Sequence, residues 1–210
     1  MHRRQLLPLL ALVLLAALTS YLLRNTRPLG RNVGASAVAA QILKESGSPQ
    51  EVHGNPNLTV VMFTDYQCPA CRKADPALRA AVARDGNVRV VYKDWPIFGE
   101  RSEHAAKVAL AAHRQGIYLT LHHRLMRSPR FDDAALRDAV ETAGGNWQQL
   151  QVDLIAHEEA IGNQLLANSR DAFALGLEGT PGYLIGPLLV QGALTEREFL
   201  RAFEQARSDT

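Results

Sequence analysis

The stretch that decides the fold of this 210-residue chain is Phe63-Thr64-Asp65-Tyr66-Gln67-Cys68-Pro69-Ala70-Cys71. It begins at the end of a continuous apolar run, Leu58–Thr64, which predicts a buried strand. Pro69 suits the first position of a helix, and a stripe of small and apolar residues continues to Val82. A second strand is predicted over Val88–Tyr92. Strand, helix and strand in this order indicate the βαβ unit of a parallel sheet.

The two cysteines of the chain, Cys68 and Cys71, are placed for redox chemistry. Side chains at positions i and i+3 of a helix share a face and can form a disulfide. Cys68 is expected at the helix N-terminus, where unpaired backbone N–H groups and the helix dipole favour a thiolate. We expect Cys68 to be accessible, and Cys71, one turn further, to be shielded and to act as the resolving partner.

Two other interpretations of the cysteine pair are weaker. A structural disulfide closing so small a loop would stabilise the fold little. A zinc site needs two more ligands, and the chain offers neither a second CxxC nor a suitably spaced histidine pair. We therefore expect no metal and no cofactor. The histidines of the predicted helical segment have the wrong spacing for that purpose: His104, His113, His122 and His123.

The rest of the chain predicts an α/β layer interrupted by an all-helical insertion. Residues from about 101 to 176 predict helices only, with Ser102 as the N-cap of the first. Residues 177–210 return to a hairpin around Gly186-Pro187 and a last helix capped by Thr195. Thr180-Pro181 precedes the hairpin. A cis bond there, beside a redox pair, would offer the backbone of Thr180 to a substrate strand.

The stretch from Phe63 to Cys71, together with Gly179-Thr180-Pro181 before a strand, resembles the DsbA-type thiol:disulfide oxidoreductases over about residues 52–206. The resemblance implies a thioredoxin-like fold with an inserted all-helical subdomain. It also implies an enzyme in which Cys68 is the attacking cysteine and Cys71 its partner. Thr180 and Pro181 would form a cis-proline loop that faces them and binds substrate.

Two departures from that family concern the redox strength of the pair. Many members carry a buried acid at the position of Met62, and many have His or Tyr at the position of Ala70. Without these groups the attacking thiolate is stabilised less and proton transfer to its partner is slower. The sequence therefore predicts a milder oxidant than the strongest members.

Two nearby features are expected to be structural. Trp95-Pro96-Ile97-Phe98 leads from the second strand into the helical insertion, and we expect a buried connection rather than a substrate groove. Asp65 is expected to serve as a turn or cap carboxylate rather than to tune the active site.

The N-terminal part of the chain predicts export. An apolar run, Leu6–Leu23, follows His2-Arg3-Arg4 and has the length of a signal anchor; a cleaved signal peptide is the alternative. The expected organisation has five parts: anchor or signal peptide 1–23, tether 24–57, first part of the thioredoxin-like core 58–100, helical insertion 101–176, second part of the core 177–210.

The charge of the chain and its expected compartment limit the classes of binding partner. The formal charge is +2, but the N-terminal 34 residues hold five arginines and no acid, so nucleic acid is not expected. The expected partners are cysteine-containing client proteins, a membrane redox recycling partner and the inner membrane itself, with the body on its periplasmic side. The alternative function is a thioredoxin-fold metal-binding protein or metallochaperone that uses the CxxC pair as ligands.

Overall fold

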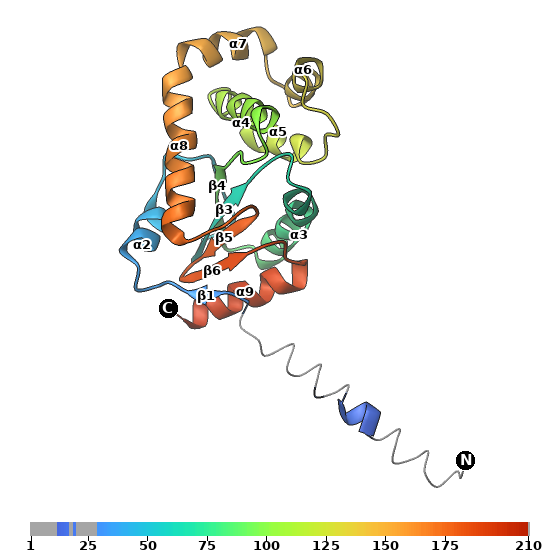
Figure 1. The fold of residues 1–210 in the computed structure, drawn as a ribbon, viewed down its shortest axis with the longest axis vertical. Helices are drawn as coiled ribbons and strands as arrows, with labels where there is room; N and C mark the ends of the chain where they lie inside the picture. The colour runs from blue at the N-terminus through green and yellow to red at the C-terminus, as the bar shows by residue number, and fades with distance from the viewer. Residues whose placement is uncertain (1–11, 17–18, 20–28, 210) are drawn as a thin grey trace, which may run out of the picture.

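The computed structural model describes residues 12–16, 19 and 29–209. Within them the strands form one six-stranded sheet, flanked by helices, with a block of further helices beyond one end of the sheet (Figure 1). The strands lie in the order β1-β6-β5-β3-β4-β2. Their bounds are β1 Arg31–Asn32, β2 Gln50–Val52, β3 Leu58–Thr64, β4 Val88–Asp94, β5 Gly182–Ile185 and β6 Leu188–Gln191. The helices are α2 Ala37–Lys44, α3 Pro69–Asp85, α4 Glu100–His113, α5 Tyr118–Leu125, α6 Asp133–Thr142, α7 Trp147–Ala156, α8 Glu158–Leu175 and α9 Glu196–Ser208.

The central strand β3 joins two hydrophobic cores because its side chains alternate between the faces of the sheet. Val60 and Met62 pack in the core that includes α3, α9 and much of the helical block. Val61 and Phe63 pack on the other face, in the core with α2 and α8. This two-sided burial explains why β3 is a continuous apolar run instead of an alternating one.

The expected strand–helix–strand unit is confirmed. Strands β3 and β4 are parallel, with Val60 opposite Val90, and α3 connects them. Pro69 occupies the first turn of α3, and the helix continues through Pro76. It ends at Gly86, whose φ of +74° is a left-handed conformation that favours glycine. The hairpin of β5 and β6 and the capped final helix are confirmed as well.

The helical block is also present, with one correction at its start. Five helices, α4 to α8, occupy the part of the chain from residue 100 to 175. The N-cap of α4 is Gly99, not Ser102. Ser102 lies inside the first turn of α4. Its hydroxyl donates to Asp65 Oδ1 at 2.6 Å, so this side chain holds the loop after β3 instead of capping the helix.

Residues 24–57 differ from the expected tether, because from residue 29 on they are built into the fold. Strand β1 pairs with β6 at one edge of the sheet, and β2 pairs with β4 at the other. Between them, α2 packs with α8 over the second core. Strands of two and three residues carry no periodic signal, and they are set by pairing with strands far away in the sequence.

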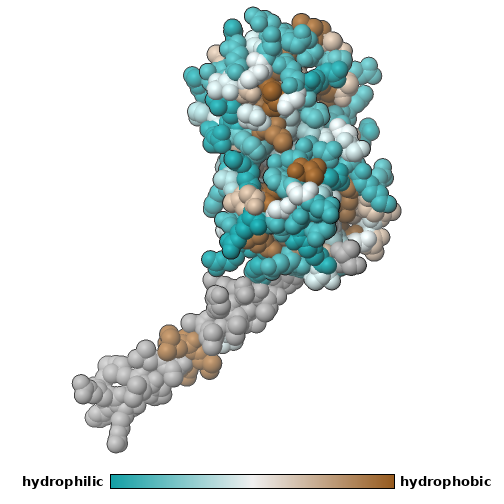
Figure 2. All heavy atoms as spheres, turned by 180° about the vertical axis from the view of Figure 1, so that it is seen from behind, coloured by the Kyte–Doolittle hydropathy of each residue, from teal (hydrophilic) through white to brown (hydrophobic). Residues whose placement is uncertain are grey.

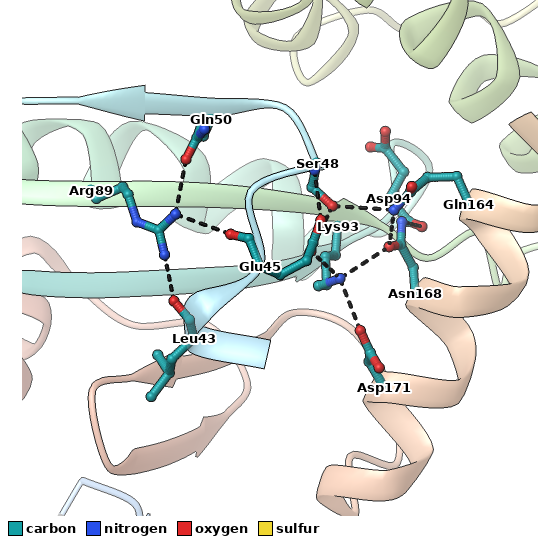
Figure 3. A network of polar contacts seen from close by, with 10 residues as sticks. All are labelled: Leu43, Glu45, Ser48, Gln50, Arg89, Lys93, Asp94, Gln164, Asn168 and Asp171. Carbon is teal, nitrogen blue, oxygen red and sulfur yellow. Dashed lines mark hydrogen bonds and ion pairs between the residues drawn. The ribbon is translucent and has the colours of Figure 1, made fainter. Parts of the chain in front are cut away.

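A network of buried polar contacts fixes this segment (Figure 3). The Lys93 side chain on β4 is only 2% exposed, and its Nζ lies 2.6 Å from Glu45 Oε2 and 2.9 Å from Asp171 Oδ2 on α8. Arg89 donates to the backbone oxygens of Leu43 and Glu45. A buried lysine needs such partners, so the segment after α2 and helix α8 are held to the same strand.

Most of the expected anchor, Leu6–Leu23, lies outside the described residues. In the part of the chain that the structure describes, no helix is both long and apolar enough to cross a membrane. Seen from behind, the folded body is mainly hydrophilic, and its apolar side chains form separate small patches (Figure 2).

Candidate functional site

Asp65, directly after β3, organises the loop that leads to the cysteines. Its carboxylate accepts hydrogen bonds from the backbone N–H of Gln67 at 2.7 Å and of Ile97 at 2.7 Å. It also accepts from Phe98 N–H and from the Ser102 hydroxyl. The expected turn carboxylate is therefore present, and it joins the CxxC loop to the 97–98 loop and the start of α4. The sequence showed the residue but not these distant partners.

The two cysteines lie together at the N-terminus of α3 as free thiols. Cys68 is the N-cap residue, and its sulfur accepts the backbone N–H of Cys71 at 3.3 Å. The expected difference in accessibility is wrong: Cys68 is 2% exposed and Cys71 is 3% exposed. Both cysteines are buried, and hydrogen bonding rather than exposure distinguishes them.

The Thr180–Pro181 bond is cis, as expected, and it lies against the cysteines. The Cys68 thiol donates to the Thr180 backbone oxygen over 3.3 Å. The Thr180 hydroxyl is buried and has no hydrogen-bond partner among the described residues. Cys68 and Thr180 are far apart in the sequence, and they meet because β3 and β5 are neighbours in the sheet.

Hydrogen bonding gives the two thiols opposite acidities. The hydrogen bond from Cys71 is the largest cause that lowers the pKa of Cys68 to about 6, against the opposing effect of burial. Thr180 and the backbone N–H groups of Ala70 and Cys71 lower it further. Burial, reinforced by the bond to Cys68, raises the pKa of the Cys71 thiol far above its ordinary value. One sulfur is thus a thiolate at neutral pH while the other keeps its proton.

The connection after β4 is only partly buried. Trp95 is 3% exposed, as expected, but Ile97 and Phe98 are 43% and 51% exposed. A Cβ atom on Gly179 would lie 4.0 Å from Ile97 Cδ1, so Ile97 lies beside the loop of Thr180 and Pro181. The expectation of a buried connection is therefore wrong for Ile97 and Phe98. These two side chains form an exposed apolar surface next to the cysteine site.

Behind the site lies a buried polar cluster that the sequence did not reveal. Met62 is buried and occupies the position where many family members have an acid. A buried acid is nevertheless present nearby, because Asp94 lies at the end of the neighbouring strand β4. Burial raises the pKa of Asp94 to about 7, and Tyr118 donates to both of its oxygens. Tyr66 Oη lies 3.1 Å from His122 Nδ1. These contacts depend on how the helices pack against the sheet, and the sequence pattern does not show that packing.

An acidic and a protonated thiol at a helix N-terminus, opposite a cis-proline loop in a mixed sheet, define a dithiol/disulfide site of the thioredoxin class. Proteins of this class are thiol:disulfide oxidoreductases. The sequence model of the DSBA-like thioredoxin domain matches residues 59–204, and the chain belongs to that family. The expected family, fold class and enzyme class are confirmed.

Solved structures agree with this assignment. A thioredoxin-like oxidoreductase from Silicibacter pomeroyi DSS-3 is 33% identical, with a TM-score of 0.75, and the match covers 82% of this chain and 98% of that one. A periplasmic thioredoxin-like protein from Salmonella enterica serovar Typhimurium is 29% identical, with a TM-score of 0.73 and the same coverage. The catalytic domain of Proteus mirabilis ScsC is 26% identical, with a TM-score of 0.72, over 85% of this chain and 99% of that domain.

Among curated proteins, the chain is similar to part of larger transport proteins. The Na(+)/H(+) antiporter NhaA 1 of Mycolicibacterium gilvum (strain PYR-GCK) is 26% identical over 164 residues. The match covers 74% of this chain and 26% of the antiporter. The chain therefore spans about a quarter of the length of the relatives it matches.

Proposed function

We propose that this protein forms or shuffles disulfides in exported client proteins, with Cys68 as the attacking cysteine and Cys71 as its partner. The observation that carries the proposal is the asymmetry of the pair. The Cys68 sulfur accepts the Cys71 N–H, and its pKa is lowered to about 6 while that of Cys71 is raised. A stabilised Cys68 thiolate is both a good leaving group and the reactive form of the reduced enzyme.

In the oxidising direction, a client thiolate attacks Cys68 Sγ of the Cys68–Cys71 disulfide. The S–S bond breaks, Cys71 takes a proton, and a mixed disulfide joins the client to Cys68. A second client thiolate then attacks the client sulfur of this bond and releases Cys68 as a thiolate. The client loses two electrons in forming its disulfide, and the enzyme gains them as the dithiol. Shuffling begins when the Cys68 thiolate of the reduced enzyme attacks a disulfide of the client protein.

The client chain would be held by the surface around the cysteines. The backbone of Thr180 adjoins Cys68, and an extended client segment can pair with it as an added strand. The exposed side chains of Ile97 and Phe98 offer apolar contact beside that segment. A shallow pocket of about 370 Å³ near Gln67 is lined by three arginines, Arg72, Arg101 and Arg130, and by one acid, Asp132, and this excess of positive charge favours acidic client residues.

Trapping of mixed disulfides tests the roles of the cysteines. Cys71→Ala should accumulate covalent complexes with reduced client proteins, because nothing resolves them, and Cys68→Ala should accumulate few. The double variant is the control for unspecific capture. Non-reducing gels and mass spectrometry of the bands provide the measurement. Equal trapping by the two single variants contradicts the assignment.

We further propose that the body works on the periplasmic side, tethered by Leu6–Leu23 and reoxidised by a membrane redox partner. The apolar N-terminal run supports this, as does the likeness to a periplasmic protein from Salmonella. A reporter that is active only in the periplasm, fused after Thr210, should be active in bacterial cells. Activity of a cytoplasm-specific reporter at the same position would contradict the proposal.

A further inference from the structure

A second cluster of reactive side chains lies one helical turn beyond the cysteines and is separate from them. Asp75 on α3 is 4% exposed, and it faces His122 and His123 on α5. His122 Nε2 lies 3.4 Å from Asp75 Oδ1, and His123 Nδ1 lies 3.3 Å from the same oxygen. Helix α3 connects two strands of the sheet and α5 belongs to the helical block, so the cluster joins these two parts of the fold (Figure 1).

The two nitrogens are buried, and they contact Asp75 Oδ1 at ion-pair distance without the geometry of a hydrogen bond. Neither His122 Nε2 nor His123 Nδ1 has a hydrogen-bond partner among the described residues. The His122 side chain is completely buried, and most buried polar atoms in proteins do find a partner. An ion bound between the three groups satisfies both nitrogens and the carboxylate together.

The two distances from Asp75 Oδ1 to the histidine nitrogens suit a tetrahedral ion. Zinc binds histidine nitrogen and carboxylate oxygen at about 2.0–2.2 Å, so two ligands of a tetrahedral site lie about 3.3–3.5 Å apart. Both distances to Asp75 Oδ1 fall in that range. All three candidate atoms lie within 4.8 Å of one another.

The rings are already oriented for binding. Tyr66 Oη lies 3.1 Å from His122 Nδ1, the nitrogen not needed for a metal, and can accept a hydrogen bond from its N–H. Tyr118 stacks on the same ring, with an interplanar angle of 20°. Partners of this kind fix the tautomer and the orientation of ligating histidines.

The cluster also has an access route and a suitable charge. His123 lines a surface pocket of about 530 Å³ together with Glu51, His53, Pro76 and Arg79. Asp75 contributes a carboxylate to the cluster, and Glu51 contributes a second carboxylate to the lining of the pocket.

We propose that Asp75, His122 and His123 form a binding site for a divalent transition-metal ion of the zinc class. Water from the pocket beside His123 takes the fourth position. The ion ties the helix that carries the cysteines to the helical block. This inference does not depend on the proposed redox function, because the CxxC sulfurs are not ligands.

Zinc titration of the untagged full-length protein, with Cys68 and Cys71 oxidised to the disulfide, tests the proposal. Competition with a chromophoric chelator should show one Zn²⁺ per chain, and Mg²⁺ should not compete. At about 100-fold excess over Kd, the melting temperature should rise by about 5–10 °C. Absence of binding to the oxidised protein, or binding that requires reduced cysteines, overturns the site.

Variants locate the ion. His123→Ala, at a side chain that is 17% exposed, should weaken zinc binding at least tenfold. His104→Ala is the matched control, because His104 pairs with Asp133 at the surface over 3.0 Å, and binding should be unchanged. Equal weakening by both variants overturns the assignment. Co²⁺ in the wild-type protein should show a tetrahedral spectrum without sulfur charge-transfer bands, and an octahedral spectrum contradicts the proposed geometry.

Discussion

Thr180 contributes its backbone carbonyl and its side-chain hydroxyl to the cysteine site. The carbonyl suits the protonated Cys68 sulfur, and the hydroxyl suits the thiolate. The backbone oxygen of Thr180 accepts a hydrogen bond from the Cys68 thiol while that thiol is protonated. Its buried hydroxyl has no partner in that form and can donate to the sulfur once the proton is lost. We therefore expect the residue before the cis proline to act as a positioning residue for the thiolate.

The first prediction concerns the titration of Cys68. Because its pKa is lowered to about 6, the thiolate should be present at neutral pH and lost as the pH falls through that value. Thr180→Val removes the hydroxyl donor and should raise the midpoint by about 0.5–1 unit. The pH dependence of alkylation, or of thiolate absorbance, measures this. The oxidised protein is the control, and a midpoint unmoved by Thr180→Val refutes the role of the hydroxyl.

Single residues could be predicted from the sequence where spacing alone determines the chemistry. Cys68 and Cys71 are one helical turn apart in any helix, and Pro69 marks where that helix begins. Asp75 and His122 could not be paired, because 47 positions separate them and only the packing of α3 on α5 brings them together. Their visible signals were a carboxylate four residues after Cys71 and two adjacent histidines.

At the level of elements, β4 is the strand that binds the outlying parts of the chain together. One of its side chains, Lys93, is buried between carboxylates from α8 and from the residue after α2. Those carboxylates are themselves 28% and 31% exposed, so each can turn to water if the lysine is removed. The buried lysine cannot turn to water if the two carboxylates are removed.

This asymmetry predicts unequal costs. The double variant Glu45→Gln/Asp171→Asn should lower the free energy of unfolding by about 3–5 kcal/mol, because it leaves a buried unpaired charge. Lys93→Met should cost less, about 1–2 kcal/mol, because the exposed carboxylates are rehydrated. Urea unfolding measures both.

The exposed Arg137–Glu141 pair is the matched control for this comparison, and Glu141→Gln should cost under about 0.5 kcal/mol. A larger loss from Lys93→Met than from the double variant would contradict the argument.

The longer elements could be predicted from the sequence and the short ones could not. Strands β3 and β4 and the helices of the block have enough residues to show a period or a continuous apolar run. Strands β1 and β2 have two and three residues, and their place at the sheet edges depends on β6 and β4. The 24–57 segment therefore looked like a tether, although its described part closes both edges.

At the scale of the whole molecule, redox strength follows from the balance between dithiol and disulfide. A lowered pKa of Cys68 stabilises the reduced form, so we expect an oxidising pair. Ala70 offers no imidazole or hydroxyl to the sulfur, which limits the effect.

We expect a reduction potential above that of thioredoxin, which is about −270 mV, but below those of the strongest oxidants of the family. Equilibration of the pure protein with a series of glutathione buffers measures it. A value at or below that of thioredoxin would make the protein a reductase and exclude the oxidising direction.

The burial of Lys93 has a consequence for protein engineering. The helical block begins after β4 and ends before β5, so it resembles a cassette that can be excised to leave a minimal scaffold. Excision of residues 100–175 would also remove Asp171 and Asn168, which lie against the Lys93 ammonium, and Tyr118, which donates to Asp94. A shortened scaffold should fold only if positions 93 and 94 are redesigned as apolar residues at the same time.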